Sequence, residues 1–141
     1  MKIGSELTPS SPSGGMPIKG RFVIHEHYAS HHHFDFRLEM DGVLKSWAIP
    51  KHPPVEPGEK KLAILVEDHP LEYIDFEGDI PQGEYGAGQV LIWDKGSYTL
   101  SEKDENKISF SLEGRKLKGN YTLFRLKRGQ KGNEWLLLKK K

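Results

Sequence analysis

Residues 33–49 read HFDFRLEMDGVLKSWAI and carry the clearest strand pattern in the chain. In an extended strand, side chains at alternate positions share a face. One face of the first half would therefore carry His33, Asp35 and Arg37, while the other face would carry only phenylalanine and leucine. The Asp-Gly pair at 41–42 is typical of a tight hairpin turn, and a second apolar run follows it. The stretch predicts a β-hairpin with one face for a core and one face of ionisable groups.

Short apolar runs separated by turn residues continue through the rest of the chain. They lie at 22–24, 62–66, 90–93, 98–100, 108–112, 121–126 and 135–138. The Asp-Lys-Gly sequence at 94–96 predicts a turn between two of them. Trp47 and Trp93 lie inside such runs, so we expect them in the core. Helical periodicity is almost absent, which predicts a mainly all-β fold: a single-domain closed or partly closed β-barrel with few short helices.

The length of 141 residues fits one domain, which we place at residues 21–141. Residues 4–20 are rich in Ser, Pro and Gly, so residues 1–20 are expected to form a flexible arm. The chain has no apolar run of about 18 residues or more, and its N-terminus lacks the apolar stretch of a signal peptide. These features predict a cytoplasmic protein.

The formal net charge is +1, so bulk charge gives no argument for binding nucleic acid. Basic residues nevertheless gather late in the chain, at positions 115, 116, 118, 125, 127, 128, 131 and 139–141. Such a surface suits a phosphate backbone, but a lysine-rich surface is more often only solvated. Both interpretations stay open.

Five of the seven histidines fall between positions 25 and 33. The chain has no cysteine, so any metal must be held by nitrogen and oxygen ligands. Imidazole and carboxylate groups suit a divalent transition metal, and Arg37 on the same face suits an anion beside it. His69, just after an apolar run, is a candidate for a third ligand or a phosphate contact, or is simply a surface histidine.

Several segments together resemble a known family. They are HYASHHHFDFRLE at 27–39, GVLKSWAIPK at 42–51, VEDHPLEY at 66–73, DFEG at 75–78, IPQG at 80–83 and YGAG at 85–88. In order and spacing, from about residue 21 to the C-terminus, they resemble the phosphoesterase domain of bacterial and archaeal ATP-dependent DNA ligase D. That pattern is far more specific than any single motif.

The resemblance implies a manganese-dependent enzyme that heals DNA 3′ ends in non-homologous end joining. Its two steps would be removal of a 3′-terminal ribonucleoside and removal of the remaining 3′-phosphate, which leaves a 3′-OH. Mn²⁺ is the implied cofactor, although other divalent transition metals fit the same ligands. The implied metal ligands are His27, His33 and Asp35. The implied phosphate-binding or catalytic residues are Arg37, His69 and Tyr73, with Lys51, Lys61 and Glu67 in supporting positions.

The chain departs from the family in two places. At Lys61 the family often has arginine, and lysine keeps the charge but lacks the bidentate fork. Residues 4–20 do not align with the family's N-terminal arm, which assists the ribonuclease step, so the phosphatase step is the more direct implication. We expect a free-standing domain that acts on DNA 3′ ends with separately encoded ligase, polymerase and end-binding repair proteins. The resemblance gives no role to His25, His31 or His32.

Two other functions fit part of the pattern. His33, Asp35 and His69 would satisfy the two-histidine, one-carboxylate set of non-haem iron oxygenases, which predicts dependence on iron and oxygen. A metal-stabilised module that grips DNA ends without cleaving them is the second alternative. Metal preference and reaction product separate these three hypotheses.

Overall fold

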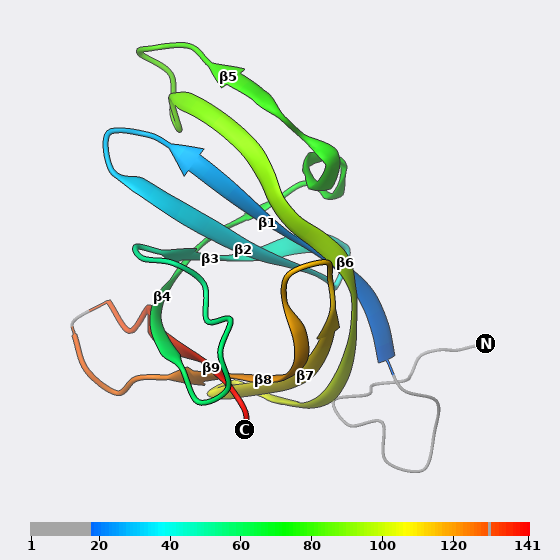
Figure 1. The fold of residues 1–141 in the computed structure, drawn as a ribbon. Helices are drawn as coiled ribbons and strands as arrows, with labels where there is room; N and C mark the ends of the chain where they lie inside the picture. Colours follow the sequence, from blue (N-terminus) through cyan, green and yellow to red (C-terminus); the bar gives the residue numbers. More distant parts are fainter. Residues whose placement is uncertain (1–17, 130) are drawn as a thin grey trace.

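The hairpin expected at residues 33–49 is present as strands β2 (His32–Met40) and β3 (Val43–Ile49) in the computed structural model, which describes residues 18–129 and 131–141 (Figure 1). Asp41 and Gly42 both have positive φ angles, 56° and 84°, as a two-residue hairpin turn of type I′ requires. This turn fixes the register, so that Arg37 lies opposite Ser46. The local sequence therefore determines both the hairpin and its pairing.

Antiparallel strands close into a barrel, which confirms the predicted fold class. The other strands are β1 (Ile18–Tyr28), β4 (Lys60–His69), β5 (Gly78–Ile80), β6 (Gly88–Asp104), β7 (Lys107–Glu113), β8 (Lys118–Arg125) and β9 (Glu134–Lys139). Neighbours follow the order β1-β2-β3-β4-β9-β8-β7-β6, and β6 pairs back to β1. The short β5 adds to the outside of β6, beyond the ring of eight (Figure 1).

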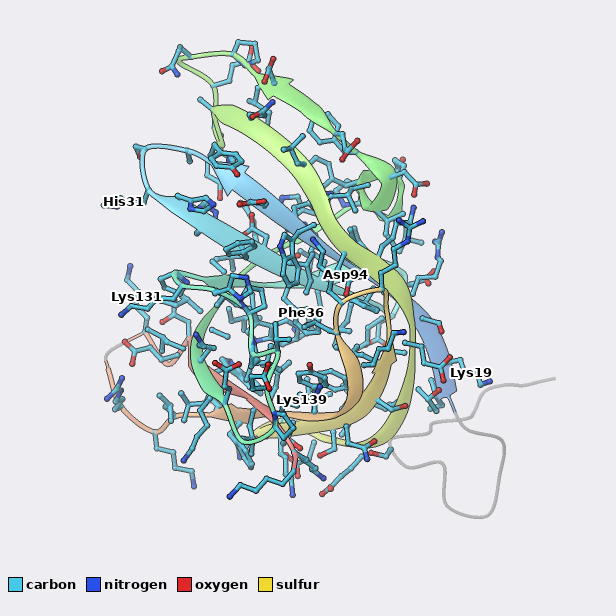
Figure 2. All side chains as sticks on the ribbon, in the orientation of Figure 1. Lys19, His31, Phe36, Asp94, Lys131 and Lys139 are labelled. Atoms are coloured by element: carbon cyan, nitrogen blue, oxygen red, sulfur yellow. The ribbon has the colours of Figure 1, made fainter. Side chains whose placement is uncertain are left out.

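The inside of the barrel is a packed apolar core. It includes Phe36, which is completely buried and is labelled in Figure 2, and Trp47, which is also completely buried. The Phe36 and Phe110 rings stack with their centroids 5.9 Å apart. Trp93 is partly buried and packs against this core, so both tryptophans lie where the sequence predicted. Because side chains fill the interior, polar chemistry is confined to the outer wall.

Strand β1 begins at Ile18, three residues before the expected start of the domain. Ile18 packs against the core, and Gly20 pairs with Tyr98 of β6. A side chain at Gly20 would collide with the Tyr98 ring, so this glycine allows close contact between strands. The remainder of the expected arm, residues 1–17, lies outside the described residues.

The prediction of a turn at 94–96 is wrong, because these residues lie within strand β6. The Asp94 carboxylate accepts hydrogen bonds from the backbone N–H groups of Arg115 (2.7 Å), Lys116 (3.2 Å) and Leu117 (2.8 Å). It therefore holds the β7–β8 loop instead of making a local turn. The strand does contain a β-bulge at Trp93. Ile24 of β1 pairs with Asp94 and the next residue of β1 pairs with Ile92, so Trp93 has no partner in β1.

A short 3₁₀ helix, η1 (Leu71–Asp75), follows β4 and covers part of the outer wall. Its buried Ile74 packs in a small second cluster with Val23 and Leu44, which face away from the barrel core. In Figure 1, η1 and β5 lie together on the side opposite to β7, β8 and β9. Within the described residues, no helix is long and apolar enough to cross a membrane.

Candidate metal centre

Three of the expected site residues meet on the outer face of the β1–β2 hairpin. His27 of β1 lies directly opposite His33 of β2, and Asp35 is two residues further along the same face. One ligand atom from each of the three residues lies within 4.8 Å of the others. The alternation that sends the phenylalanines of β2 into the core thus presents these polar groups together.

Each of the two imidazoles is oriented by a hydrogen bond to a backbone carbonyl. His27 donates from Nε2–H to the carbonyl of Gly86 (2.9 Å), and His33 donates from Nδ1–H to the carbonyl of His31 (2.9 Å). In the neutral rings, the other nitrogens carry lone pairs, and these two nitrogens lie 3.3 Å apart. Asp35 Oδ2 lies 3.3 Å from the same nitrogen of His33. Three acceptor atoms therefore converge.

Such convergence of acceptors requires a cation or a proton between them. Contact with Asp35 raises the pKa of His33 against the opposing effect of burial. Burial by itself would raise the pKa of Asp35, but contacts with His27 and His33 and the nearby charge of Arg37 hold it well below its usual range. The carboxylate is therefore ionised. An ionised carboxylate with two carbonyl-oriented imidazoles is a suitable donor set for a divalent transition metal.

Arg37 is buried beside this cluster, with only 3% of its surface exposed. Its Nε donates to His25 Nδ1 (3.0 Å), and its Nη1 donates to Ser46 Oγ (2.9 Å) and approaches His69 Nδ1 (3.1 Å). Its Nη2 lies 3.4 Å from Asp35 Oδ2. These contacts hold a fixed positive charge next to the candidate metal ligands.

His69 at the end of β4 and Tyr73 in η1 complete a cleft over the cluster. The cleft has a volume of about 260 Å³ and is lined by the three candidate ligands, Arg37, His69, Tyr73 and Tyr85, among others. Burial and the charge of Arg37 lower the pKa of His69. Burial raises the pKa of Tyr73, so its hydroxyl keeps its proton and is able to donate a hydrogen bond.

The three expected supporting residues lie outside this cleft lining. Lys51 is exposed just after β3, and Glu67 is exposed near the end of β4. The carbonyl of Glu67 lies 3.2 Å from His69 Nδ1. Lys61 lies at the other end of β4 with its amine 4.0 Å from the Glu59 carboxylate.

The other three histidines between positions 25 and 33 lie in different environments. His31 is exposed at the tip of the β1–β2 hairpin (Figure 2). His32 points to the opposite face from His33, where it contacts Glu26 (2.8 Å) and stacks on Tyr28. His25 is completely buried and accepts a hydrogen bond from Arg37.

Besides His25, two contributors to the site were missed in the sequence. Ser46 is completely buried and accepts from Arg37 while donating to the carbonyl of Leu44. The hairpin turn predicts this partner, because the register places Ser46 opposite Arg37. The Gly86 carbonyl, which orients His27, belongs to a distant loop and leaves no signal in the side-chain pattern.

The cluster of His27, His33 and Asp35 does not match the ligand set of the iron oxygenase alternative. Its histidines are His27 and His33, whereas that hypothesis used His33 and His69. His69 is instead placed against Arg37. The geometry therefore places His69 beside the buried Arg37 and outside the candidate ligand cluster.

A closed β-barrel with a nitrogen–oxygen ligand set and a buried arginine on its outer wall defines a domain with a candidate metal centre and a fixed positive charge beside it. A family model described as "DNA Ligase D 3'-phosphoesterase domain" matches residues 25–125. The chain belongs to this family.

The chain is similar to parts of much longer proteins. It is 48% identical over 140 residues to the multifunctional non-homologous end joining protein LigD of Pseudomonas aeruginosa. It is 46% identical over 136 residues to the multifunctional non-homologous end joining DNA repair protein LigD of Mycobacterium tuberculosis. Each match covers 92% of this chain but only 17% of the relative, so the chain spans less than a fifth of their length.

Proposed function

We propose that this domain is a metal-dependent phosphoesterase that removes the 3′-phosphate from DNA ends and leaves a 3′-OH. The observation that carries the proposal is the convergence of His27 Nδ1, His33 Nε2 and Asp35 Oδ2 beside the buried Arg37. A metal held by these three atoms would lie next to a fixed positive charge, where a phosphate is stabilised by both. Membership of the 3'-phosphoesterase family supports the same reaction.

The proposed metal is Mn²⁺, with other divalent transition metals able to use the same nitrogen and oxygen ligands. When bound, it would polarise a phosphoryl oxygen and lower the pKa of a bound water. His27, His33 and Asp35 would hold it, and the hydrogen bonds from the two imidazoles to backbone carbonyls would fix the orientation of the rings.

The residues on the other side of the cleft would bind the phosphate. Arg37 supplies positive charge, and the Tyr73 hydroxyl supplies a hydrogen-bond donor. His69 Nδ1 has two alternative contacts, because it either accepts from Arg37 or donates to the Glu67 carbonyl. When Nδ1 accepts from Arg37, the Nε2–H of neutral His69 would donate a hydrogen bond to a phosphate oxygen. A protonated His69 would instead donate a proton to the leaving oxygen. Lys51, Lys61 and Glu67 would support the site from outside the cleft lining.

The proposal extends to removal of a 3′-terminal ribonucleoside before the phosphatase step. The substrate is then a DNA 3′ end, as a primer-template or a single-stranded tail, in non-homologous end joining. The names of the relatives, multifunctional non-homologous end joining proteins, support this setting. We propose separately encoded ligase, polymerase and end-binding proteins as partners in repair.

The test uses two primer-templates, one with a 3′-phosphate and one with a single 3′-ribonucleotide, each incubated with Mn²⁺ or with chelator. Metal-dependent conversion of the first to a 3′-OH supports the phosphatase, and shortening of the second supports the ribonuclease step. Asp35→Asn is the matched inactive variant, because it keeps the size of the side chain. Binding of these strands without turnover would contradict the phosphoesterase proposal and favour the alternative of a non-catalytic module that binds DNA ends. Iron- and oxygen-dependent chemistry would restore the oxygenase alternative.

A further inference from the structure

Large hydrophobic side chains are exposed at two positions within the described residues. Tyr28 is 44% exposed, and Tyr85, in the loop between β5 and β6, is 81% exposed. Tyr28 already has partners, since its hydroxyl donates to Glu26 (2.8 Å) and its ring stacks on His32 with centroids 4.6 Å apart. Tyr85 has neither an aromatic partner nor a side-chain hydrogen bond among the described residues. Its ring is free to bind something else.

The two tyrosines differ in their position relative to the candidate metal centre. Tyr85 lines the same cleft as His27, His33 and Asp35, whereas Tyr28 follows His27 in β1 and therefore points to the opposite face. The neighbour of Tyr85, Gly86, accepts the hydrogen bond that orients His27. The loop that carries Tyr85 is thus tied to a candidate metal ligand.

The loop is also shaped by its own backbone. Glu84 N–H donates to the carbonyl of Pro81 (3.2 Å), and Ala87 N–H donates to the carbonyl of Glu84 (3.1 Å). Gly83 and Gly86 have φ angles of 89° and 77°, which side chains rarely allow. Two successive turns therefore present Tyr85 at the rim of the cleft, although burial contributes little to holding its ring.

We propose that Tyr85 is a stacking platform for the nucleobase of the 3′-terminal nucleotide whose phosphate is bound in the cleft beside Arg37. The proposal rests on the proposed function. In a terminal nucleotide, only the sugar separates the base from its 3′-phosphate, so a phosphate in the cleft leaves the base at the rim. Every base has a π-face, so stacking would bind all four without sequence preference.

The test compares the wild type with Tyr85→Ala, Tyr85→Phe and Tyr85→Trp. Binding of a fluorescent 3′-phosphorylated strand is measured by anisotropy in chelator, and kcat and KM are measured with Mn²⁺. A second strand has the same sequence but lacks the terminal base. Tyr28→Ala is the matched control, because it removes the other exposed tyrosine from the opposite face.

Loss of base stacking corresponds to weakening by about 5- to 150-fold. We expect Tyr85→Ala to weaken binding and raise KM by such a factor on the normal strand, with kcat little changed. On the strand without the terminal base, the variant and the wild type should be equal. Tyr85→Phe and Tyr85→Trp should retain binding, and the Tyr85→Trp protein should show fluorescence quenching only with the base present.

Equal losses on the two strands, or a Tyr28→Ala loss as large as that of Tyr85→Ala, would overturn the stacking role. An unchanged KM and unchanged binding in Tyr85→Ala would do the same. Failure of the stacking proposal can be distinguished from failure of the proposed function. If no strand is hydrolysed, the phosphatase proposal fails, while the comparison of binding with and without the base still decides the role of Tyr85.

Discussion

His25 should make the metal-free protein sensitive to mild acid. Its ring is completely buried, its Nδ1 accepts from Arg37, and its Nε2–H donates to the carbonyl of Phe76 (3.1 Å). Burial, and then the charge of Arg37, lower the pKa of His25 from 6.5 to about 4. A protonated His25 would lose the hydrogen bond from Arg37 and face a neighbouring positive charge.

The sign and size of the effect follow from proton linkage. Between pH 6.5 and about 4, the unfolded chain binds a proton at His25 that the folded protein does not. Stability is therefore complete above pH 6.5 and falls as the pH decreases towards 4. One pKa unit corresponds to about 1.4 kcal/mol, so the total loss across this window is about 3 kcal/mol.

The assay is urea unfolding in chelator at a series of pH values, for the wild type and for His25→Gln. The Gln amide is able to accept from Arg37 and donate to Phe76 but does not titrate in this range. Other groups titrate equally in both proteins, so the difference in unfolding free energy isolates His25. A difference that stays constant from pH 7 to pH 4 would refute the reasoning.

Asp35→Asn should lower metal-dependent turnover by ~100-fold or more and abolish Mn²⁺ binding in calorimetry, whereas His32→Ala, on the opposite face, should be mild. Equal activity of the Asp35→Asn protein would exclude this metal centre. Asp94→Ala removes the acceptor of three loop N–H groups and should lower the unfolding free energy by about 3 kcal/mol in urea titration. A loss near zero would mean that those amides find other partners. Gly88→Ala would place its Cβ against the Tyr28 carbonyl at a φ of 122°, so amide exchange along the β1–β6 pairing should accelerate, and unchanged exchange would contradict that strain.

Local patterns in the sequence were sufficient for much of the fold. The alternation before the turn and the Asp-Gly pair at 41–42 fix the β2–β3 hairpin, because both depend on residues close in sequence. The same alternation places His33, Asp35 and Arg37 on one face. The family resemblance supplied His27, which the structure places opposite His33.

Features that depend on residues distant in the sequence could not be predicted from local patterns. Asp94 resembles a turn residue because its partners lie more than 20 residues later, in the β7–β8 loop. The role of His25 depends on Phe76, 51 residues away, as well as on Arg37. The bulge at Trp93 is likewise visible only when β6 is paired with β1. A single sequence does not reveal such pairings, because they are decided by closure of the barrel.

Strand β2 alternates strictly between core and candidate site, and this ties the length of the strand to function. Deleting one residue within it would exchange the two faces, placing Arg37 among aromatic rings and a phenylalanine in the candidate metal cluster. A single deletion would therefore disrupt both the packing of the core and the candidate metal cluster. Changes of length are consequently expected only in the turns at either end, and transfer of this centre to another barrel would require the whole β1–β2–β3 segment as one piece.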